Sequence, residues 1–427
     1  MMNRKEAPEF NTIEKIEIAQ ATEKKLSNGI PVYLINGGSQ ELIRVEFIFP
    51  AGTCYQPKPL LAYYALEMME NGTKNYTADQ ISEHLDFYGS YYAVKTEQES
   101  SYITLFSLNK HLNNSITFVE EIIKNACFPE DEFQLMMKNG KQQYLIDSEK
   151  VNVVARRRFS QLLYGEDNPF GKIARLENYD QMTRNELFEF YQEHYNSANC
   201  TIVVAGRLPD DILQTLDKHF GKSNWGKNSI IAKPKLEIQQ NPVNEHWVEK
   251  KDALQSAIRI GRRWFDRKHP DYFTFQLMNT ALGGYFGSRL MSNIREDKGY
   301  TYGIGSGLST NNYGGVFTIA TEVGTDVTQA ALKEIYFEIN RLQEELMPEE
   351  ELQLVKNYTL GNFLRSIDGP FALADKFISI WEIQSDYNFY DRSLAAIQNC
   401  STMDVRRMAQ NYLQKKDLIE LVVGNKQ

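Results

Sequence analysis

The segment PEDEFQL at residues 129–135 returns later in the chain as PEEELQL at residues 348–354, which is 219 positions further on (129 to 348). Each copy opens a stretch in which apolar residues recur at helical spacing. A recurring segment indicates an internal repeat, and an internal repeat indicates that the chain is built from similar structural units. The sequence therefore predicts two halves that resemble one another.

Two further features recur at nearly the same spacing. TRNE at residues 183–186 and STMD at residues 401–404, a shift of 218 positions (183 to 401), each place a hydroxyl three residues before an acid. This pattern is typical of the first turn of a helix. A short apolar segment follows in each half, TIVVAG at 201–206 and IELVVG at 419–424, and both segments are predicted to be strands. The two halves are thus expected to end alike.

The predicted boundary between the halves lies near residue 235. Residues 225–242 are rich in Lys, Asn, Gln and Pro and have little apolar periodicity, which favours a linker. The expected domains are residues 1–234 and 235–427. Within each half, strand-like and helical segments are grouped rather than strictly alternating, as in residues 29–49. This grouping predicts an α+β fold of two similar domains, each with a mostly antiparallel sheet packed against helices.

Composition excludes several classes of protein. The chain of 427 residues has a net charge of -9, so the phosphate backbone of a nucleic acid would be repelled. No apolar run approaches the roughly 18 residues that a membrane span requires, and the first eight residues are not followed by the apolar core of an export signal. The four cysteines are scattered, which favours reduced thiols. We expect a soluble, cytoplasmic protein with no membrane or nucleic-acid partner.

The second half holds the most specific motif. NTALGGYFGSRL at 279–290, followed by IREDKGYTY at 294–302, resembles the second-domain signature of the insulinase/pitrilysin family of zinc peptidases, the inverzincins, which includes the mitochondrial processing peptidase. In the first half, a predicted helix at 59–69 that runs into Gly72 and Thr73 fits the same frame. The resemblance covers nearly the whole chain and implies the two-domain fold of that family.

The resemblance also shows what is missing. Active members of the family carry His-x-x-Glu-His on the first-half helix, where the histidines hold zinc and the glutamate acts as general base. Those positions fall here on Tyr63, Leu66 and Glu67, and the third ligand, a glutamate in the family, falls near Gln143, whose neutral amide is a poor zinc ligand. No two histidines of the chain lie on one helical turn; they are His84, His111, His194, His219, His246 and His269. We therefore expect a non-catalytic member of the family without its own cofactor. Tyr63 and Glu67 are expected to line a polar cavity. The alternative is that Glu67 acts alone as a general base.

Two substrate-binding residues of the family are present. The arginine and the tyrosine seven positions later, which contact the substrate backbone in the family, correspond to Arg295 and Tyr302. A guanidinium offers a fixed fork of donors to peptide carbonyls, and a phenol donates to a developing oxyanion. The alternative is an ordinary surface pair of Arg295 with Glu296 or Asp297 and a strand position for Tyr302.

The glycines near this motif are predicted to be structural. GIGSG at 303–307 lacks the following helix and downstream acid of a dinucleotide-binding loop, so a nucleotide site is rejected. Gly283 and Gly284 suit a tight turn with a close backbone approach and a positive φ at one of them.

The function expected from the resemblance is that of a non-catalytic, substrate-binding subunit. In some pairs of this family, one subunit bears the zinc motif and the other bears the Arg and Tyr substrate pair. The expected partner is therefore a zinc-bearing peptidase subunit of the same family. The expected ligands are peptides held in a closed chamber. Two alternatives stay open. One is a structural or peptide-binding homodimer without proteolysis, and the other is an active zinc metallopeptidase with unconventional ligands.

Overall fold

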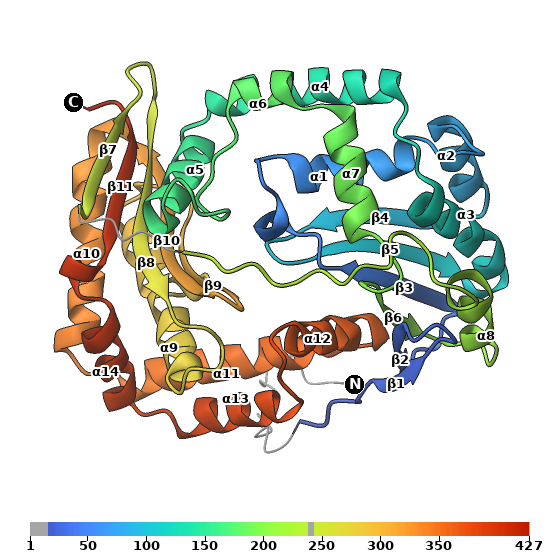
Figure 1. The fold of residues 1–427 in the computed structure, drawn as a ribbon. Helices are drawn as coiled ribbons and strands as arrows, with labels where there is room; N and C mark the ends of the chain where they lie inside the picture. Colours follow the sequence, from blue (N-terminus) through green and yellow to red (C-terminus); the bar gives the residue numbers. More distant parts are fainter. Residues whose placement is uncertain (1–15, 238–242, 427) are drawn as a thin grey trace, which may run out of the picture.

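The computed structural model describes residues 16–237 and 243–426, and Figure 1 shows its two halves, each with one sheet. Residues 1–8, on which the expected lack of an export signal depends, lie outside this range, as do residues 238–242 of the predicted linker. Residues 225–237 contain no helix or strand, as a linker requires. No helix of the described ranges is both long and apolar enough to cross a membrane.

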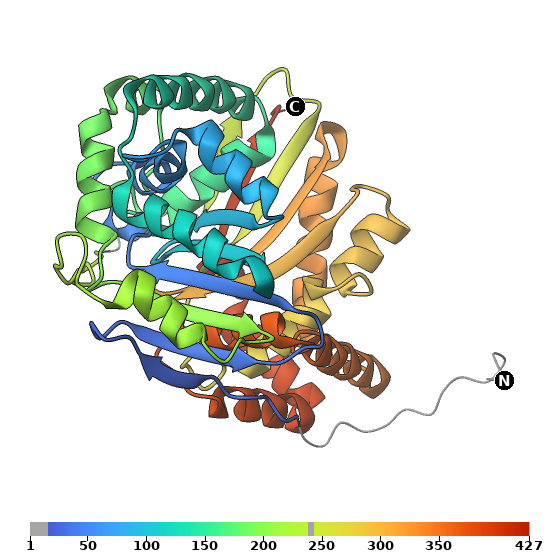
Figure 2. The same ribbon diagram turned by 90° about the vertical axis from the view of Figure 1, so that its right-hand side faces the viewer.

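The first half contains strands and helices that follow the predicted grouping. Its strands are β1 (Thr22–Lys25), β2 (Pro31–Asn36), β3 (Leu42–Phe49), β4 (Tyr91–Thr96), β5 (Ser101–Leu108) and β6 (Thr201–Gly206). Its helices are α1 (Leu61–Glu67), α2 (Ala78–Phe87), α3 (Leu112–Asn125), α4 (Glu130–Ser148), α5 (Val151–Tyr164), α6 (Leu176–Gln181), α7 (Arg184–His194) and α8 (Ile212–Leu216). Figure 2 shows α3 and α8 on the outer side of the sheet.

The second half repeats this plan. Its strands are β7 (Glu245–Glu249), β8 (Gln255–Trp264), β9 (Ile304–Asn311), β10 (Gly314–Gly324) and β11 (Ile419–Gly424). Its helices are α9 (Tyr272–Asn279), α10 (Thr328–Glu344), α11 (Glu349–Arg365), α12 (Pro370–Glu382), α13 (Asn388–Asn399) and α14 (Thr402–Tyr412).

Both sheets are mostly antiparallel, which confirms the predicted fold class. The first sheet has the order β1-β2-β6-β3-β5-β4 and the second has the order β7-β11-β8-β10-β9. Only the pairs β2–β6 and β7–β11 are parallel. Strand β6 is buried along its whole length because helices cover both faces of the sheet, and this explains its unbroken apolar sequence.

The repeat read from the sequence is present in the structure. Helices α4 and α11 begin directly after Pro129 and Pro348, and both predicted hydroxyl–acid pairs form capping boxes in which the side chains of Thr183 and Ser401 accept a backbone N–H. The last strands, β6 and β11, occupy the predicted residues. Local sequence signals therefore located the equivalent elements of the two halves.

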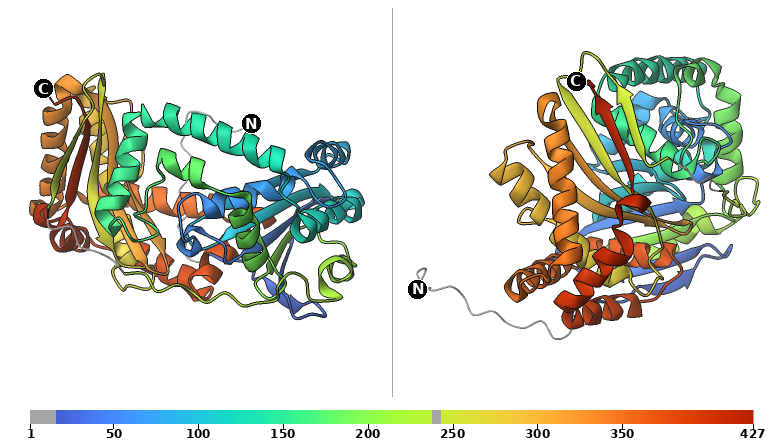
Figure 3. Two further views of the ribbon diagram at one scale, coloured as in Figure 1. Left: turned by 45° about the horizontal axis from the view of Figure 1, so that its top comes forward. Right: turned by 90° about the vertical axis from the view of Figure 1, so that its left-hand side faces the viewer.

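The two halves exchange one helix each. Helix α5 of the first half packs on β8 and β11 of the second sheet, where Phe159 is 4% exposed (Figure 3). Helix α12 of the second half packs on β2 and β6 of the first sheet, where Phe377 is 8% exposed (Figure 1). The predicted boundary at residues 234 and 235 thus separates the sheets, whereas the packing of helices crosses it. Each sheet is completed by a helix from the other half.

Candidate functional site

The second-half motif forms an irregular helical corner before the edge strand β9. Residues Thr280–Gly284 continue α9 as a π-helical turn, and a second π-helical segment covers Met291–Asp297. A Cβ on Gly283 would lie 2.6 Å from the Ser306 Oγ and 2.7 Å from the Ser306 backbone nitrogen, so the predicted close backbone approach exists. The predicted positive φ is wrong, because neither Gly283 nor Gly284 has one; a π-helical turn makes the corner instead.

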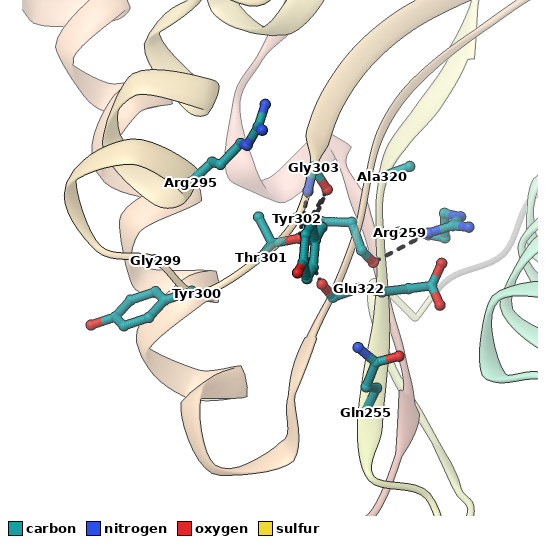
Figure 4. Close-up of a pocket in the computed structure, with 11 residues that line it drawn as sticks. Gln255, Arg259, Arg295, Gly299, Tyr300, Thr301, Tyr302, Gly303, Ala320 and Glu322 are labelled. Carbon is teal, nitrogen blue, oxygen red and sulfur yellow. Dashed lines mark hydrogen bonds between the residues drawn. The ribbon is translucent and has the colours of Figure 1, made fainter.

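Arg295 and Tyr302 line the same pocket, which has a volume of about 640 Å³ (Figure 4). Arg295 comes from the second π-helical segment, and Tyr302 comes from the loop that leads into β9. In the view of Figure 4, Tyr302 stands between Arg295 on one side and two strand residues, Arg259 and Glu322, on the other. Residues of a helix, a loop and two strands are therefore assembled around one hollow.

Neither member of the pair has the ordinary surface role considered as the alternative. Within residues 16–237 and 243–426, Arg295 forms no ion pair with Glu296 or Asp297; its guanidinium lies 4.7 Å from the centre of the Phe286 ring. Tyr302 precedes β9 rather than lying in a strand, and its side chain is 97% exposed. Both groups can thus reach a ligand in the pocket.

Thr301 holds the loop that carries Tyr302. Its hydroxyl donates to the Glu322 carbonyl oxygen at 2.7 Å and accepts the Gly303 N–H at 3.0 Å. A further hydroxyl, that of Thr321 on β10, lies 3.0 Å away. Fixed backbone on both sides of Tyr302 limits the entropy that the phenol loses when it binds a ligand.

The floor of the pocket consists of strand residues that were not predicted from the sequence. Gln255 and Arg259 of β8 and Ala320 and Glu322 of β10 form it, and the register pairs Arg259 with Ala320. They belong to the face of the second sheet on which α5 packs. The sequence of β8 contains a usable signal, because Arg259 lies between two buried isoleucines, Ile258 and Ile260.

The first-half positions of the zinc motif lie on α1, but they do not form one accessible face. Tyr63 and Glu67 are accessible, whereas Leu66 is 0% exposed in the first-half core. The accessible face continues to Glu70, one turn beyond Glu67. Burial raises the pKa of Glu67, and a hydrogen bond from Tyr63 partly offsets the rise. Burial and the neighbouring charge of Glu67 raise the pKa of Glu70 to about 7.

Gln143 does not lie with these residues. It is exposed on α4, and its amide donates to the Asp147 carboxylate at 3.1 Å on the same helix. The next residue, Tyr144, faces inward and packs against Tyr179 at 5.7 Å between ring centres. Position 143 itself thus turns away from the core and position 144 turns toward it, since one residue is a rotation of about 100° on a helix.

The donor groups around α1 do not fit a zinc ion. A zinc site requires three or four ligands from His, Cys, Asp or Glu within coordination distance. The described parts of the chain contain no group of three such residues that could hold a metal. Of the histidines, His194 bonds the Pro50 carbonyl oxygen and His219 bonds the Glu120 carboxylate, so these two serve the core.

A second hollow, of about 910 Å³, lies between the first sheet and α12. Its polar side chains are largely engaged with one another across the two halves: Asn312 with Glu99, and Tyr102 with Glu382. This arrangement suits a joint between the halves better than a ligand site.

The structure combines two similar α+β halves, an Arg and Tyr pocket on the second sheet, and a first-half helix without zinc ligands. In these features the chain is similar to two-domain peptidases of the M16 type. A family model described as the peptidase M16 inactive domain matches residues 181–359, which include Arg295 and Tyr302. The chain is therefore related to the M16 peptidases, and the resemblance read from the sequence is confirmed.

Curated relatives support the same relationship. A protein of Rickettsia bellii named an uncharacterized zinc protease is 24% identical over 94% of this chain and 96% of its own length. Another of that name, from Rickettsia felis, is 25% identical over 80% of this chain and 82% of its own length.

Solved structures show the same fold. A peptidase M16 inactive domain from Pseudomonas fluorescens superposes with a TM-score of 0.85 at 18% identity, covering 96% of this chain and 99% of that one. A protease from Helicobacter pylori gives a TM-score of 0.85 at 16% identity, covering 96% of this chain and 100% of that one. At these identities the likeness concerns the fold.

Proposed function

We propose that this chain is the non-catalytic, substrate-binding subunit of a heterodimeric zinc endopeptidase, and that it binds peptides for cleavage at a zinc ion held by a partner of the same family. One observation carries the proposal. Arg295 and Tyr302 share an accessible pocket, whereas the motif positions on α1 hold Tyr63, Leu66 and Glu67. The substrate-binding groups of the fold are kept and the zinc ligands are lost.

The pocket chemistry suits an extended peptide. The guanidinium of Arg295 can donate two parallel hydrogen bonds to backbone carbonyl oxygens, and the phenol of Tyr302 can donate to the carbonyl of the bond to be cut. Both donors would bind backbone carbonyl oxygens of the peptide, and these are free only in an unfolded segment. In the proposed complex the two subunits enclose a chamber that admits such segments and excludes folded proteins. The free cysteines agree with the cytoplasm as its location.

The test combines zinc content, binding and turnover. Elemental analysis of the purified chain after dialysis against trace zinc is expected to give far less than one zinc per chain. Addition of a zinc-bearing family member from the same organism is expected to produce cleavage of unstructured peptides. In that complex, Arg295→Ala with Tyr302→Phe is expected to lower turnover by about ten- to a thousandfold, because contacts made in the transition state are lost.

Each alternative predicts a different result. An active enzyme with unconventional ligands would hold one tightly bound zinc per chain. A peptide-binding homodimer would have twice the mass of the chain in solution and would bind peptides without gaining cleavage when the partner is added. Arg207→Ala in the first half is the matched control, since Arg207 is more than half exposed and lies outside the pocket.

A further inference from the structure

Arg259 on the pocket floor is partly buried and has no carboxylate partner. Its Nη1 donates to two backbone carbonyl oxygens, at 2.9 Å to Ile258 and 3.5 Å to Thr321. Within residues 16–237 and 243–426, no carboxylate oxygen lies within the 4.0 Å of an ion pair with this guanidinium. Arg259 lines the same pocket as Arg295 and Tyr302.

Arg289, a buried arginine elsewhere in the second half, forms a two-point ion pair with Glu351, at 2.8 and 2.9 Å. Arg263, four residues along β8 from Arg259, is partly buried; its guanidinium lies 5.7 Å from the centre of the Tyr164 ring, and within the described residues its Nε has no hydrogen-bond partner. Arg259 differs from Arg289 because it lines a hollow instead of facing a carboxylate.

The charges around Arg259 favour an incoming anion. Burial is the main cause that lowers the pKa of Arg259; Glu322 raises it, and a second cation, Arg156 of α5, lowers it. A guanidinium that is removed from water without a carboxylate partner is destabilising, and an anion that enters the site relieves the cost. Charge-assisted bonds of the Arg fork to a carboxylate are among the strongest that a protein forms.

We infer that Arg259 is a carboxylate-recognition residue, which makes the pocket prefer peptides that carry an acidic group beside the segment bound by Arg295 and Tyr302. The inference rests on the proposed function, because it names the substrate class of the same pocket. The carboxylate can come from an Asp or Glu side chain or from the C-terminus of the peptide. Gln255, which also lines the pocket and is exposed, offers a further amide donor to the same group.

Fluorescence anisotropy with matched peptides tests the inference without a partner subunit. Four labelled peptides share one unstructured sequence and differ only in a central Glu or Gln and in a free or amidated C-terminus. The wild-type chain is expected to bind the peptide with the recognised carboxylate about ten- to a hundredfold more tightly than its neutral counterpart. The central pair tests a side-chain source, and the terminal pair tests a C-terminal source.

Three variants assign the preference to Arg259. Arg259→Gln is expected to remove the preference while the neutral peptide binds as before, and Arg259→Lys is expected to keep part of it. Glu322→Gln is expected to strengthen binding of the acidic peptide, because a competing carboxylate is removed. Circular dichroism melts of each variant check that the fold is kept.

The outcomes separate the two proposals. If acidic and neutral peptides bind equally to the wild-type chain, and Arg295→Ala weakens both, the carboxylate inference is overturned and the proposed function stands. A preference for the acidic peptide that persists in Arg259→Gln also overturns the inference. If none of the four peptides binds, the proposed function fails as well.

Discussion

Asn312, at the tip of the β9–β10 hairpin, donates two hydrogen bonds to the carboxylate of Glu99, at the tip of the β4–β5 hairpin: one from its backbone N–H at 2.7 Å and one from its side-chain amide at 2.9 Å. Next to them, the Asn311 amide donates to Gln98 at 2.6 Å. The two hairpins belong to different halves, so equivalent parts of the repeat contact each other directly.

Replacement of Glu99 by Ala is expected to weaken this joint. It leaves two donors of Asn312 without their acceptor, which costs about 1 to 3 kcal/mol for partly buried groups. Amide hydrogen exchange at the two hairpin tips should become faster, and the melting temperature should fall. Glu97→Ala is the control, because within the described residues the one ion pair of Glu97 is with the exposed Lys95, and such surface pairs contribute little. Equal effects of the two substitutions would contradict the assigned role of Glu99.

The exchanged helices predict a coupling between the halves. Phe159 on α5 and Phe377 on α12 occupy equivalent positions, 218 residues apart (159 to 377), and each packs on the sheet of the other half. Either Phe→Ala change is expected to reduce the free energy of unfolding by roughly 3 kcal/mol or more through the cavity it leaves. Because each helix connects both halves, calorimetry should show one transition that moves as a whole.

Two separate transitions, of which only one shifts, would mean that the halves unfold independently despite the exchange. Phe87→Ala on α2 serves as the matched control, since the Phe87 side chain is 81% exposed and its removal should leave the transition nearly unchanged.

The sequence predicted what local patterns encode. Helix starts at Thr183 and Ser401 and the final strands follow from capping and periodicity, and they agree with the structure. The helix exchange could not be predicted in this way, because an amphipathic helix does not specify which of two similar sheets it covers. The third-ligand position was predicted only as near Gln143, because a shift of one residue turns a helical side chain by about 100°. Arg259 was missed because β8 also carries Arg262 and Arg263, so one more arginine in the strand resembles a surface position.

The burial of Leu66 predicts that the zinc motif cannot simply be restored. The resemblance read from the sequence places Leu66 where the family has the glutamate of His-x-x-Glu-His, and Leu66 is 0% exposed in the core between α1 and the first sheet. Leu66→Glu is expected to destabilise the chain by at least about 3 kcal/mol, because it buries a carboxylate without a partner. Leu66→Met, which keeps the volume, should cost less than about 1.5 kcal/mol. Similar unfolding midpoints in urea for both variants would show that this part of α1 can turn outward.

The raised pKa of Glu70 predicts that the free energy of unfolding depends on pH, and a single substitution can isolate this contribution. Burial, and then the charge of Glu67, raise the pKa of Glu70 from 4.5 to about 7 in the folded chain. The folded state therefore binds the proton more tightly than the unfolded state, so this contribution to stability is complete below pH 4.5 and is lost as the pH rises through 7. Glu70→Gln mimics the protonated form. It is expected to stabilise the chain at pH 8 by on the order of 2 kcal/mol and to change little at pH 4.5.

The comparison at each pH is between the variant and the wild type, because other groups titrate over the same range. Glu344→Gln is the control, since Glu344 is exposed at the end of α10. Urea unfolding at pH 4.5, 6 and 8 should show a difference that grows with pH for Glu70→Gln and stays constant for Glu344→Gln. A constant difference for both would mean that Glu70 is already ionised in the folded chain at pH 6, as an exposed carboxyl would be.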